Sequence, residues 1–500
     1  MRALRAVVAA VLVATSLAAL PGGAAVAPTE RWVVTFDDAT GLPADLGSIL
    51  RRAGAIDGVA LTTIDTVAVT LPVGGIEALR SRSDVVAVRP ERRLEFHLAK
   101  SVPFIGADRA RLDQPETVSG DSPEGPWEVQ RPAVDGTGQV IAVVDTGVWG
   151  EHPDLAGRVL AQRDFELAYA GELLLTPEQL DTFAATTGPL AGVTDDVGHG
   201  THVAAIAAGT GAGTSGRANN NRGVAPGAKV VDLRISPQAH TTDNNVGWER
   251  NALAAYDWLV RHHADPEFGP HGIRVVNNSW GTGESTLDGE QLDYSPFAQL
   301  LPKLTQAGVV VVFSAGNSGT GDNVTDKLLP TGHPDVITVA AGCHPGSTSS
   351  GCRPATPDRQ IASFSSRGPA VDVTAPGVDI VAAVNASSGA ALGQISGDFS
   401  GTQQSDAVTN RVLHANFSGT SMSGPHVAGL AALLLQADPA LTPFDVRVIL
   451  AATSRDLLQS GRDIHTGWGM VDAPTALVAA ARHAAGVPVQ QQFPSVDTAP

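Results

Sequence analysis

The chain has 500 residues, 43% of them hydrophobic, which is enough for two or three domains with buried cores and excludes a disordered or repeat protein. Its 33 basic and 51 acidic residues give a formal net charge of −18, which argues against nucleic acid or an anionic membrane surface as a partner. The acidic excess lies after residue 100, where it favours solubility.

Residues 1–27 have the layout of a secretory signal peptide. Two arginines precede an uncharged apolar run from Ala6 to Leu20, and an A-x-A sequence ends at Ala27. The alternative is a membrane anchor, but the apolar run is short for a bilayer span. We therefore expect cleavage after Ala27, a secreted extracellular product and no membrane partner.

Residues 28–100 predict a small α+β domain of the ferredoxin-like type. Short apolar segments alternate with helical patterns, in the order strand Trp32–Phe36, helix Pro43–Ala53, strand Thr66–Leu71, helix Gly75–Ser81 and strand Val85–Val88. One interpretation of these residues is an ordinary N-terminal domain that stays attached to the rest of the chain.

Residues 101–482 form the larger predicted domain. A polar, proline-rich stretch from Gln114 to Arg131 comes first, where cleavage or trimming is one expectation. Strands and helices then alternate: Val140–Val144, Thr201–Ala208, Lys229–Leu233, Glu249–His262, Val275–Asn278 and Val309–Ser314. Such alternation predicts an α/β fold with a mostly parallel sheet covered by helices on both faces.

Four polar residues lie at the ends of predicted strands or near the starts of predicted helices. In an α/β fold, functional residues gather at the carboxyl ends of the strands. Asp145 ends a strand in the sequence DTG, and His199 begins a helix in HGTHVA. Asn317 follows a strand in FSAGN, and Ser421 stands in GTSMSGPHVAG at the start of a helix. A helix N-terminus favours negative charge, which suits a nucleophilic hydroxyl facing a developing oxyanion. Taken alone, Ser421 is equally well explained as a helix cap.

The chain has two cysteines, and both lie in one short stretch of sequence. Cys343 and Cys352 are close in a polar loop sequence, so in an exported chain we expect one local disulfide, with two free thiols as the alternative. No further ligand pair supports a metal site there.

Residues 483–500 are rich in glutamine, proline and small residues and predict a disordered tail.

The three motifs DTG, HGTHVA and GTSMSGPHVAG, in this order, resemble the active-site motifs of the subtilisin-like serine proteases. The resemblance implies that Asp145 orients the base, His199 is the general base and then acid, and Ser421 is the nucleophile. It also implies that Asn317 donates to the oxyanion. The fold it implies is the subtilisin-like sheet covered by helices.

The same resemblance implies a site for an extended polypeptide substrate. Ser279, Trp280 and Gly281 match the segment that pairs with substrate and lines one side of the specificity pocket, and Ser314, Ala315 and Gly316 match the other side. The pocket floor should lie between Gly319 and Pro330. Because Asp322, Asp326 and Leu328 are all found there, preference for an apolar or for a basic side chain stays open.

Residues 28–100 resemble, more loosely, the inhibitory propeptide of this family. The sequence Ser101-Val102-Pro103 resembles a mature N-terminus, which implies self-cleavage near Lys100. The resemblance also implies a zymogen that is inhibited by its own propeptide. The resemblance implies a reaction that needs no cofactor and no metal at the catalytic residues. Whether calcium is bound elsewhere as a structural ion stays open. Nothing in the sequence indicates an assembly, so we expect a monomer.

The sequence therefore predicts a secreted serine endopeptidase that hydrolyses peptide bonds through an acyl-enzyme on Ser421. Two alternatives stay open. The first is a non-catalytic secreted binding protein with the same fold, because a fold does not prove activity. The second is a hydrolase of small esters or amides that uses the same residues.

Overall fold

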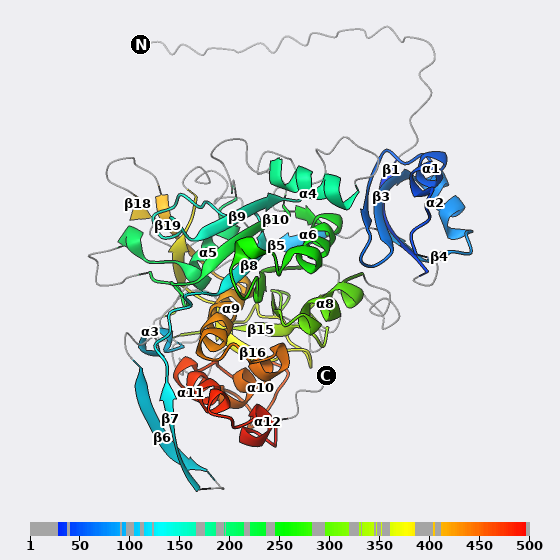
Figure 1. Ribbon diagram of the computed structural model, residues 1–500. Coiled ribbons are helices and arrows are strands. Elements are labelled where there is room, and N and C mark those ends of the chain that lie inside the picture. The colour runs from blue at the N-terminus through cyan, green and yellow to red at the C-terminus, as the bar shows by residue number, and fades with distance from the viewer. Residues whose placement is uncertain are drawn as a thin grey trace, which may run out of the picture.

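The fold is described from a computed structural model of the chain (Figure 1). The described residues are 29–37, 41–90, 93–96, 105–110, 115–122, 125–166, 176–186, 195, 197–214, 221–236, 246–282, 296–319, 330–331, 333–344, 347, 352, 361–385, 404–405 and 412–496. The predicted signal peptide at 1–27, the predicted cleavage region around Lys100 and the pocket floor at Asp322, Asp326 and Leu328 lie outside the described residues.

The N-terminal unit is a four-stranded antiparallel sheet with two helices. Its elements are β1 (Thr29–Phe36), α1 (Leu46–Arg52), β2 (Asp57–Leu61), β3 (Thr66–Pro72), α2 (Val73–Arg80) and β4 (Val85–Pro90). The strand order is β2-β3-β1-β4, as in a ferredoxin-like fold. Strand β2 was not predicted, because its Asp57-Gly58 start is typical of a turn.

Both faces of this small sheet are covered. Trp32 and Val34 of β1 point to a core shared with α1 and α2. Val33, between them, and Leu61 of β2 belong instead to a core shared with α6 (Glu249–His262) and α8 (Pro296–Gln306) of the larger domain. Figure 1 shows the unit, in blue, beside these helices. Because side chains alternate along β1, one face of the sheet packs on α1 and α2 and the other packs on the larger domain.

The larger domain is built on a seven-stranded sheet in the order β16-β15-β14-β12-β8-β10-β9, in which every pairing is parallel. The strands are β8 (Val140–Asp145), β9 (Val159–Asp164), β10 (Lys229–Arg234), β12 (Val275–Asn278), β14 (Val310–Ser314), β15 (Ile337–Gly342) and β16 (Val373–Pro376). The predicted mostly parallel sheet is confirmed.

Helices bury both faces of this sheet, which explains why every residue of β8 is buried. Ile141 and Val143 face the core of α5 (His199–Ala208), α9 (Thr420–Ala437), α10 (Pro443–Thr453) and α11 (Ala473–Ala484). Val140, Ala142 and Val144 face the core of α4 (Pro177–Thr186), α6 and α8. Because the strands are parallel, their carboxyl ends share one edge, and Asp145 ends β8 there.

The remaining elements are short or peripheral. They are α3 (Ala107–Ala110), the 3₁₀ turns at Ala212–Thr214 and Pro266–Phe268, a sheet of β11 (Val246–Trp248), β5 (Arg93–Phe96) and β13 (Trp280–Thr282), and a sheet of β17 (Ile380–Ala383), β19 (Val412–Phe417) and β18 (Gln404–Ser405). Among the described residues, no helix combines the length and apolar character that a bilayer crossing needs.

The polar, proline-rich stretch from Gln114 to Arg131 contains a hairpin. Strands β6 (Glu116–Ser122) and β7 (Gly125–Arg131) pair antiparallel along their whole length and extend away from the body of the molecule (Figure 1). The guanidinium of Arg482 on α11 lies 4.7 Å from the ring centroid of Trp127 on β7. This cation–π contact helps to hold the hairpin against α11. Cross-strand pairing thus forms two strands in spite of the proline and glycine residues of this stretch.

The prediction of a disordered tail is wrong for residues 483–496. Helix α11 continues to Ala484, and α12 (Val489–Gln492) follows with Val489 fully buried. The side-chain amide of Gln492 donates to the carbonyl oxygens of Ala479 and Val487 at 3.2 and 2.9 Å. One buried valine and one bonded amide order a segment whose composition alone suggests no core.

The predicted disulfide is confirmed. Cys343, which directly follows β15, is bonded to Cys352, nine positions further along the chain. Cys343 is buried in a small cluster with Ala341, Ala362 and Val378. The bond therefore fastens the loop to the edge of the core.

We expect the double variant Cys343→Ser, Cys352→Ser to fold with a free energy of unfolding lower by about 2–3 kcal/mol, because only a small ring is closed. Urea unfolding of the two proteins measures this difference. Alkylation and mass measurement of the unreduced wild type serve as the control for the bond. A loss above about 5 kcal/mol would show that the bond does more than close its loop.

Candidate active site

Asp145 is fully buried at the carboxyl end of β8. Its Oδ1 accepts a hydrogen bond from the backbone N–H of Thr146 at 2.7 Å. The chain then turns at Gly147, whose φ of 111° is a backbone conformation that residues with a Cβ rarely adopt. In the DTG sequence, the aspartate ends the strand, the threonine N–H donates to the carboxylate, and the glycine makes the turn.

His199 is the first residue of α5, and its Nδ1 lies 2.6 Å from Asp145 Oδ1. A carboxylate only accepts, so the proton of this contact belongs to Nδ1. In the neutral ring, Nε2 is then the atom that can accept a proton. The buried carboxylate therefore selects the tautomer that a general base requires.

Close approach of the two segments explains the glycine after the histidine. A Cβ on Gly200 would lie 2.1 Å from the carbonyl oxygen of Gly147 and 3.1 Å from Cβ of Asp145. Real Cβ atoms do not approach backbone oxygen that closely. Gly200 is therefore required for α5 to begin against the end of β8.

Ser421 is the second residue of α9 and is fully buried. Its hydroxyl donates to the carbonyl oxygen of Ser279 at 3.1 Å, and the Ser279 hydroxyl donates back to the carbonyl oxygen of Ser421 at 2.7 Å. The hydroxyl thus lies at a helix N-terminus, where unpaired N–H groups favour negative charge.

Asn317 lies three residues beyond β14 and is held by Thr420, the residue before Ser421. Its Oδ1 accepts from the N–H and from the hydroxyl of Thr420, both at 2.9 Å. Because the backbone N–H can only donate, the oxygen of the amide must face Thr420, and the NH2 group faces elsewhere. Asn317 can therefore donate beside Ser421.

His202, one turn after His199, has a packing role. Its ring centroid lies 4.4 Å from that of Phe417, and its Nε2 lies 3.2 Å from the carbonyl oxygen of Ala415. Burial lowers its pKa well below the usual value, so the ring is neutral at neutral pH. Since β19 runs through Phe417 toward Ser421, this contact joins the helix of the histidine to the strand that leads to the serine.

The predicted substrate-binding segments lie beside these residues. Strand β13 pairs antiparallel with β5 of the N-terminal part, with Trp280 opposite Phe96 and Gly281 opposite Glu95, while β11 pairs with the other edge of β5. An extended segment thus lies between two strands, as expected for strand addition.

The side chain of Trp280 does not line a pocket. It is fully buried, its Nε1 donates to the carbonyl oxygen of Val144 at 2.9 Å, and its ring packs against Phe297 and Phe313. Only the main chain of Trp280 is available for pairing, as the antiparallel ladder shows. An indole needs a partner for its N–H, and the end of β8 supplies one inside the core.

Ser314, Ala315 and Gly316, the predicted opposite side, are buried behind Asn317. The backbone N–H of Ala315 donates to the carbonyl oxygen of Val339 at 2.9 Å, and that of Gly316 to the Thr420 hydroxyl at 3.0 Å. Gly316 has a φ of 93°. This segment therefore sets the direction of Asn317.

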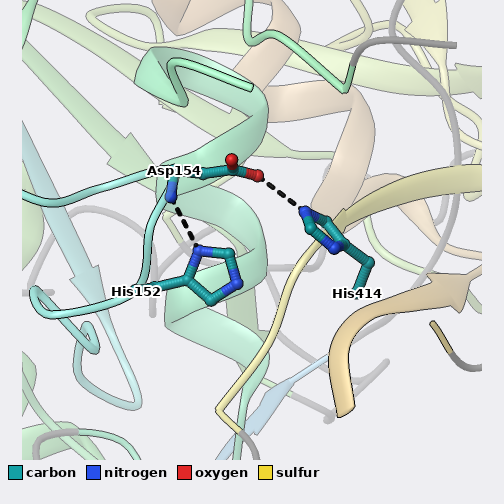
Figure 2. A group of neighbouring side chains, drawn as sticks. All are labelled: His152, Asp154 and His414. Atoms are coloured by element: carbon teal, nitrogen blue, oxygen red, sulfur yellow. Dashed lines mark hydrogen bonds and ion pairs between the residues drawn. The ribbon is translucent and has the colours of Figure 1, made fainter. Parts of the chain in front are cut away.

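One buried group in the described part of the chain has a composition that suits a metal: His152, Asp154 and His414 (Figure 2). Nε2 of His414 lies 2.7 Å from Asp154 Oδ2, and Nδ1 of His152 accepts from the backbone N–H of Asp154 at 3.0 Å. Since that Nδ1 carries a lone pair, the neutral ring holds its proton on Nε2.

These residues therefore do not fit a metal. The proton on Nε2 of His152 blocks the nitrogen that could face an ion, and two imidazoles are not calcium ligands. The same bond recurs at His333, whose Nδ1 accepts from the N–H of Asp335 at 3.1 Å. It is thus a property of the His-Pro-Asp turn, which is present at both positions.

Sequence reasoning missed Asp195, Thr146 and Thr201, which connect Asp145 to His199 through hydrogen bonds. Asp195 is four residues before His199 in DDVGHGTH. An aspartate just before a glycine and a helix start is a recognisable cap signal, but two aspartates stand there and only the structure selects the first.

The sequence profile of the subtilase family matches residues 136–469, which include all four residues described above. Fervidolysin of Fervidobacterium pennivorans is 34% identical over 347 residues, covering 68% of this chain and 41% of fervidolysin. Serine protease AprX of Bacillus subtilis strain 168 is 32% identical over 321 residues, covering 63% of this chain and 61% of AprX. The chain thus matches less than two thirds of either relative.

The crystal structure of fervidolysin, described as a keratinolytic enzyme related to subtilisin, superposes with a TM-score of 0.60 at 25% identity. The superposition covers 90% of this chain and 61% of fervidolysin. Fold, motif positions and family profile agree, and the chain belongs to the subtilase family of serine proteases.

Proposed function

We propose that this chain is a serine endopeptidase that cleaves peptide bonds through an acyl-enzyme on Ser421. The observation that carries the proposal is the buried contact of 2.6 Å between His199 Nδ1 and Asp145 Oδ1, in a subtilase domain whose Ser421 lies at a helix N-terminus. This contact makes Nε2 of His199 the proton acceptor. A binding protein without catalysis would not require that tautomer.

In the proposed reaction, Nε2 of His199 takes the proton of the Ser421 hydroxyl while Oγ attacks the substrate carbonyl carbon. Asp145 holds the ring and stabilises its protonated form. The oxyanion accepts from the Asn317 NH2 group and from the backbone N–H of Ser421. His199 then gives its proton to the leaving amine, and water hydrolyses the acyl-enzyme by the same steps in reverse order. No metal or organic cofactor takes part.

The proposed substrates are polypeptides in extended conformation. An antiparallel segment between β11 and β13 gains main-chain hydrogen bonds on both edges, whatever its side chains are. Such pairing favours peptides over small esters or amides. The side-chain preference depends on residues 320–329, which lie outside the described residues.

We also propose that residues 28–100 are an inhibitory propeptide, which is removed by self-cleavage near Lys100. Two observations support this. The strand β5, from the end of this segment, occupies the position between β11 and β13 where substrate would bind. The body of the segment packs its second sheet face against α6 and α8.

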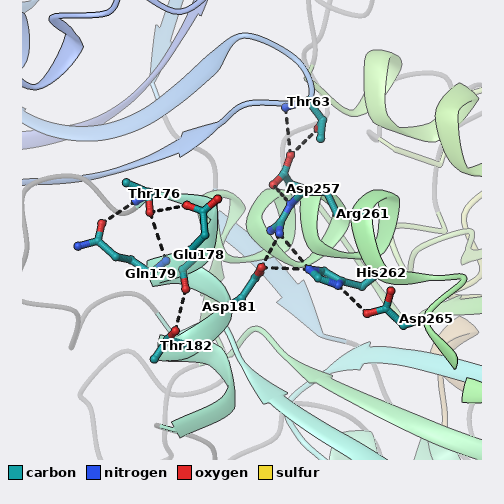
Figure 3. Close-up of polar contacts among 10 residues, drawn as sticks. All are labelled: Thr63, Thr176, Glu178, Gln179, Asp181, Thr182, Asp257, Arg261, His262 and Asp265. Atoms are coloured by element: carbon teal, nitrogen blue, oxygen red, sulfur yellow. Dashed lines mark hydrogen bonds and ion pairs between the residues drawn. The ribbon is translucent and has the colours of Figure 1, made fainter. Parts of the chain in front are cut away.

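Ionic contacts reinforce this packing. Arg89 donates to both oxygens of the buried Glu249 at 2.5 and 2.6 Å, and Arg250 donates to Asp57 at 2.8 Å. The hydroxyl of Thr63 donates to Asp257, which also accepts from Arg261 at 3.1 Å (Figure 3). Charges of α6 therefore find partners on the N-terminal unit.

Residues 1–27 are proposed to direct secretion, since the disulfide suits an oxidising compartment. The domain boundaries at 27 and 100 and a monomeric state belong to the same proposal, whereas the predicted boundary at 482 lies inside α11. Structural calcium, common among subtilases, stays open. The stretch from Thr210 to Asn221 is no clear match to a calcium loop of the family, and its residues 215–220 lie outside the described residues.

The variant Ser421→Ala should lose labelling by a fluorophosphonate and at least about 10⁴-fold in kcat, because the nucleophile is gone. Activity-based labelling and peptide hydrolysis after removal of the N-terminal segment measure both losses. Ser423→Ala, two residues further along α9 and equally buried, is the matched control and should keep its labelling. Wild type that stays unlabelled would refute a catalytic function.

Asn317→Asp keeps an oxygen toward Thr420 but replaces the donating NH2 by a second oxygen. We expect kcat to fall by roughly 10²–10³-fold with little change in KM, the effect of losing one oxyanion donor. Steady-state kinetics on one peptide measure both constants. A fall in kcat of less than threefold would remove Asn317 from the proposed oxyanion site.

Arg89→Met in the full chain should remove both guanidinium hydrogen bonds to the buried Glu249 and so weaken the inhibited state by about 2–5 kcal/mol. The lag before activity appears should shorten, with a new N-terminus near residue 101 found by N-terminal sequencing. Arg80→Met is the control, because Arg80 pairs with Glu77 inside the N-terminal unit. Equal lags for wild type and Arg89→Met would contradict the inhibitory contact.

A further inference from the structure

The carboxylate of Asp195 is fully buried and accepts five hydrogen bonds. Its Oδ1 accepts from the Thr146 hydroxyl at 2.9 Å and from the N–H groups of Val197 and Gly198 at 3.2 and 2.7 Å. Its Oδ2 accepts from the N–H and the hydroxyl of Thr201 at 2.9 and 2.6 Å. No cation pairs with it in the contacts of the described residues.

These bonds complete the start of α5, which its own N-cap cannot do. The N-cap is Gly198, with a φ of 87° and no side chain to accept from the first helical N–H groups. Asp195 accepts from the N–H of Thr201, and the Thr146 hydroxyl accepts from the N–H of Gly200 at 2.9 Å. The donors on either side of His199 are therefore held by residues outside the helix.

Thr146 connects this cap to the other half of the catalytic pair. Its hydroxyl donates to Asp195 and accepts from Gly200, while its backbone N–H donates to Oδ1 of Asp145, the oxygen that contacts His199. An ordinary helix cap would need no bond to the end of β8. The Asp195 carboxylate thus determines the spacing of Asp145 and His199.

The five donors also determine the charge of Asp195. Three are backbone N–H groups, which cannot accept, and the two threonine hydroxyls already accept from Gly200 and from the N–H of Trp149. Hydrogen bonds donated to a carboxylate favour its ionised form. Burial raises its pKa, whereas the bonds from Thr201, Gly198 and Thr146 act in the opposite direction.

The other titratable groups around it do not neutralise this charge. On β10, burial raises the pKa of Asp232 well above its usual value, and the charge of Asp195 adds to that shift. On α5, burial keeps His202 neutral. Asp145, on β8, is bonded to His199. His199 is therefore the group beside Asp195 that gains a positive charge during the proposed reaction.

We propose that Asp195 is a positioning residue of the catalytic pair, which acts through Thr146 and the start of α5 and whose negative charge favours the protonated form of His199. The inference rests on the proposed protease function. It separates Asp195 from a mere cap, because a cap would affect folding alone, whereas this charge changes how the reaction depends on pH.

The first test compares Asp195→Asn with wild type in the pH profile of kcat/KM, with active sites counted by fluorophosphonate titration. Losing the charge should move the midpoint of the acid limb to lower pH by roughly 0.5–1 unit, because the protonated imidazole loses a favourable interaction. The control is Asp463→Asn, whose carboxylate accepts from the N–H groups of His465 and Thr466 and from the Thr466 hydroxyl beside β16. Its midpoint should not move.

The second test remains informative if Asp195→Asn fails to fold. Thr146→Val keeps the shape of the side chain but removes the hydroxyl, and kcat/KM per active site should fall by roughly 10- to 100-fold. Thr146→Ser restores the hydroxyl and should recover to within threefold of wild type.

An unchanged acid limb in folded Asp195→Asn, or equal kcat/KM for Thr146→Val and wild type, would overturn the inference. If Asp195→Asn does not fold, the two threonine variants decide. Wild type without fluorophosphonate labelling would instead refute the proposed function, so the two failures are distinguishable.

Discussion

The arrangement of the molecule depends on a buried carboxylate meeting a buried imidazole. Asp145 and His199 are both fully buried, and a buried carboxylate is costly unless hydrogen bonds satisfy it. The chain meets this cost with a turn at Gly147, with Gly200 close against that turn, and with Thr146 and Asp195 fixing both segments. The small residues in these motifs are therefore required for Asp145 and His199 to come into contact. A larger residue at position 200 would separate the carboxylate from the ring before any chemistry began.

The parallel sheet explains how residues so far apart in the chain come together. Parallel strands place their carboxyl ends at one edge, and here β8 delivers Asp145, β12 leads to Ser279 and β14 leads to Asn317. Ser421 arrives from α9, whose N-terminus contacts both of the last two through Ser421 and Thr420. The sheet is buried on both faces, so these edge positions are held by strands that have no freedom to shift register.

Sequence patterns predicted the parallel sheet, the ferredoxin-like unit, the disulfide and the helices that begin at His199 and near Ser421, because each rests on local periodicity or on nearby residues. They failed where partners distant in the chain decide. Trp280 turns its indole into the core because the carbonyl of Val144 is there to accept its N–H. Hairpin β6–β7 forms by cross-strand pairing in spite of its prolines, and the C-terminal tail is ordered by Val489. Asp195 was missed for the same reason, since its importance lies in a bond to Thr146.

The contacts of the N-terminal unit bear on the release that we propose for it. Glu249 is fully buried in the complex, and its partner Arg89 comes from the segment itself. In the proposed release, Glu249 loses the Arg89 side chain, which both pairs with it and helps to bury it. The loss of the ion pair and the loss of part of the cover therefore occur in one step, which avoids the high cost of a charge that loses its partner but stays buried. The apolar contact of the sheet face that holds Val33 and Leu61 is lost in the same step. An interface of this kind would hold the segment while it is covalently attached.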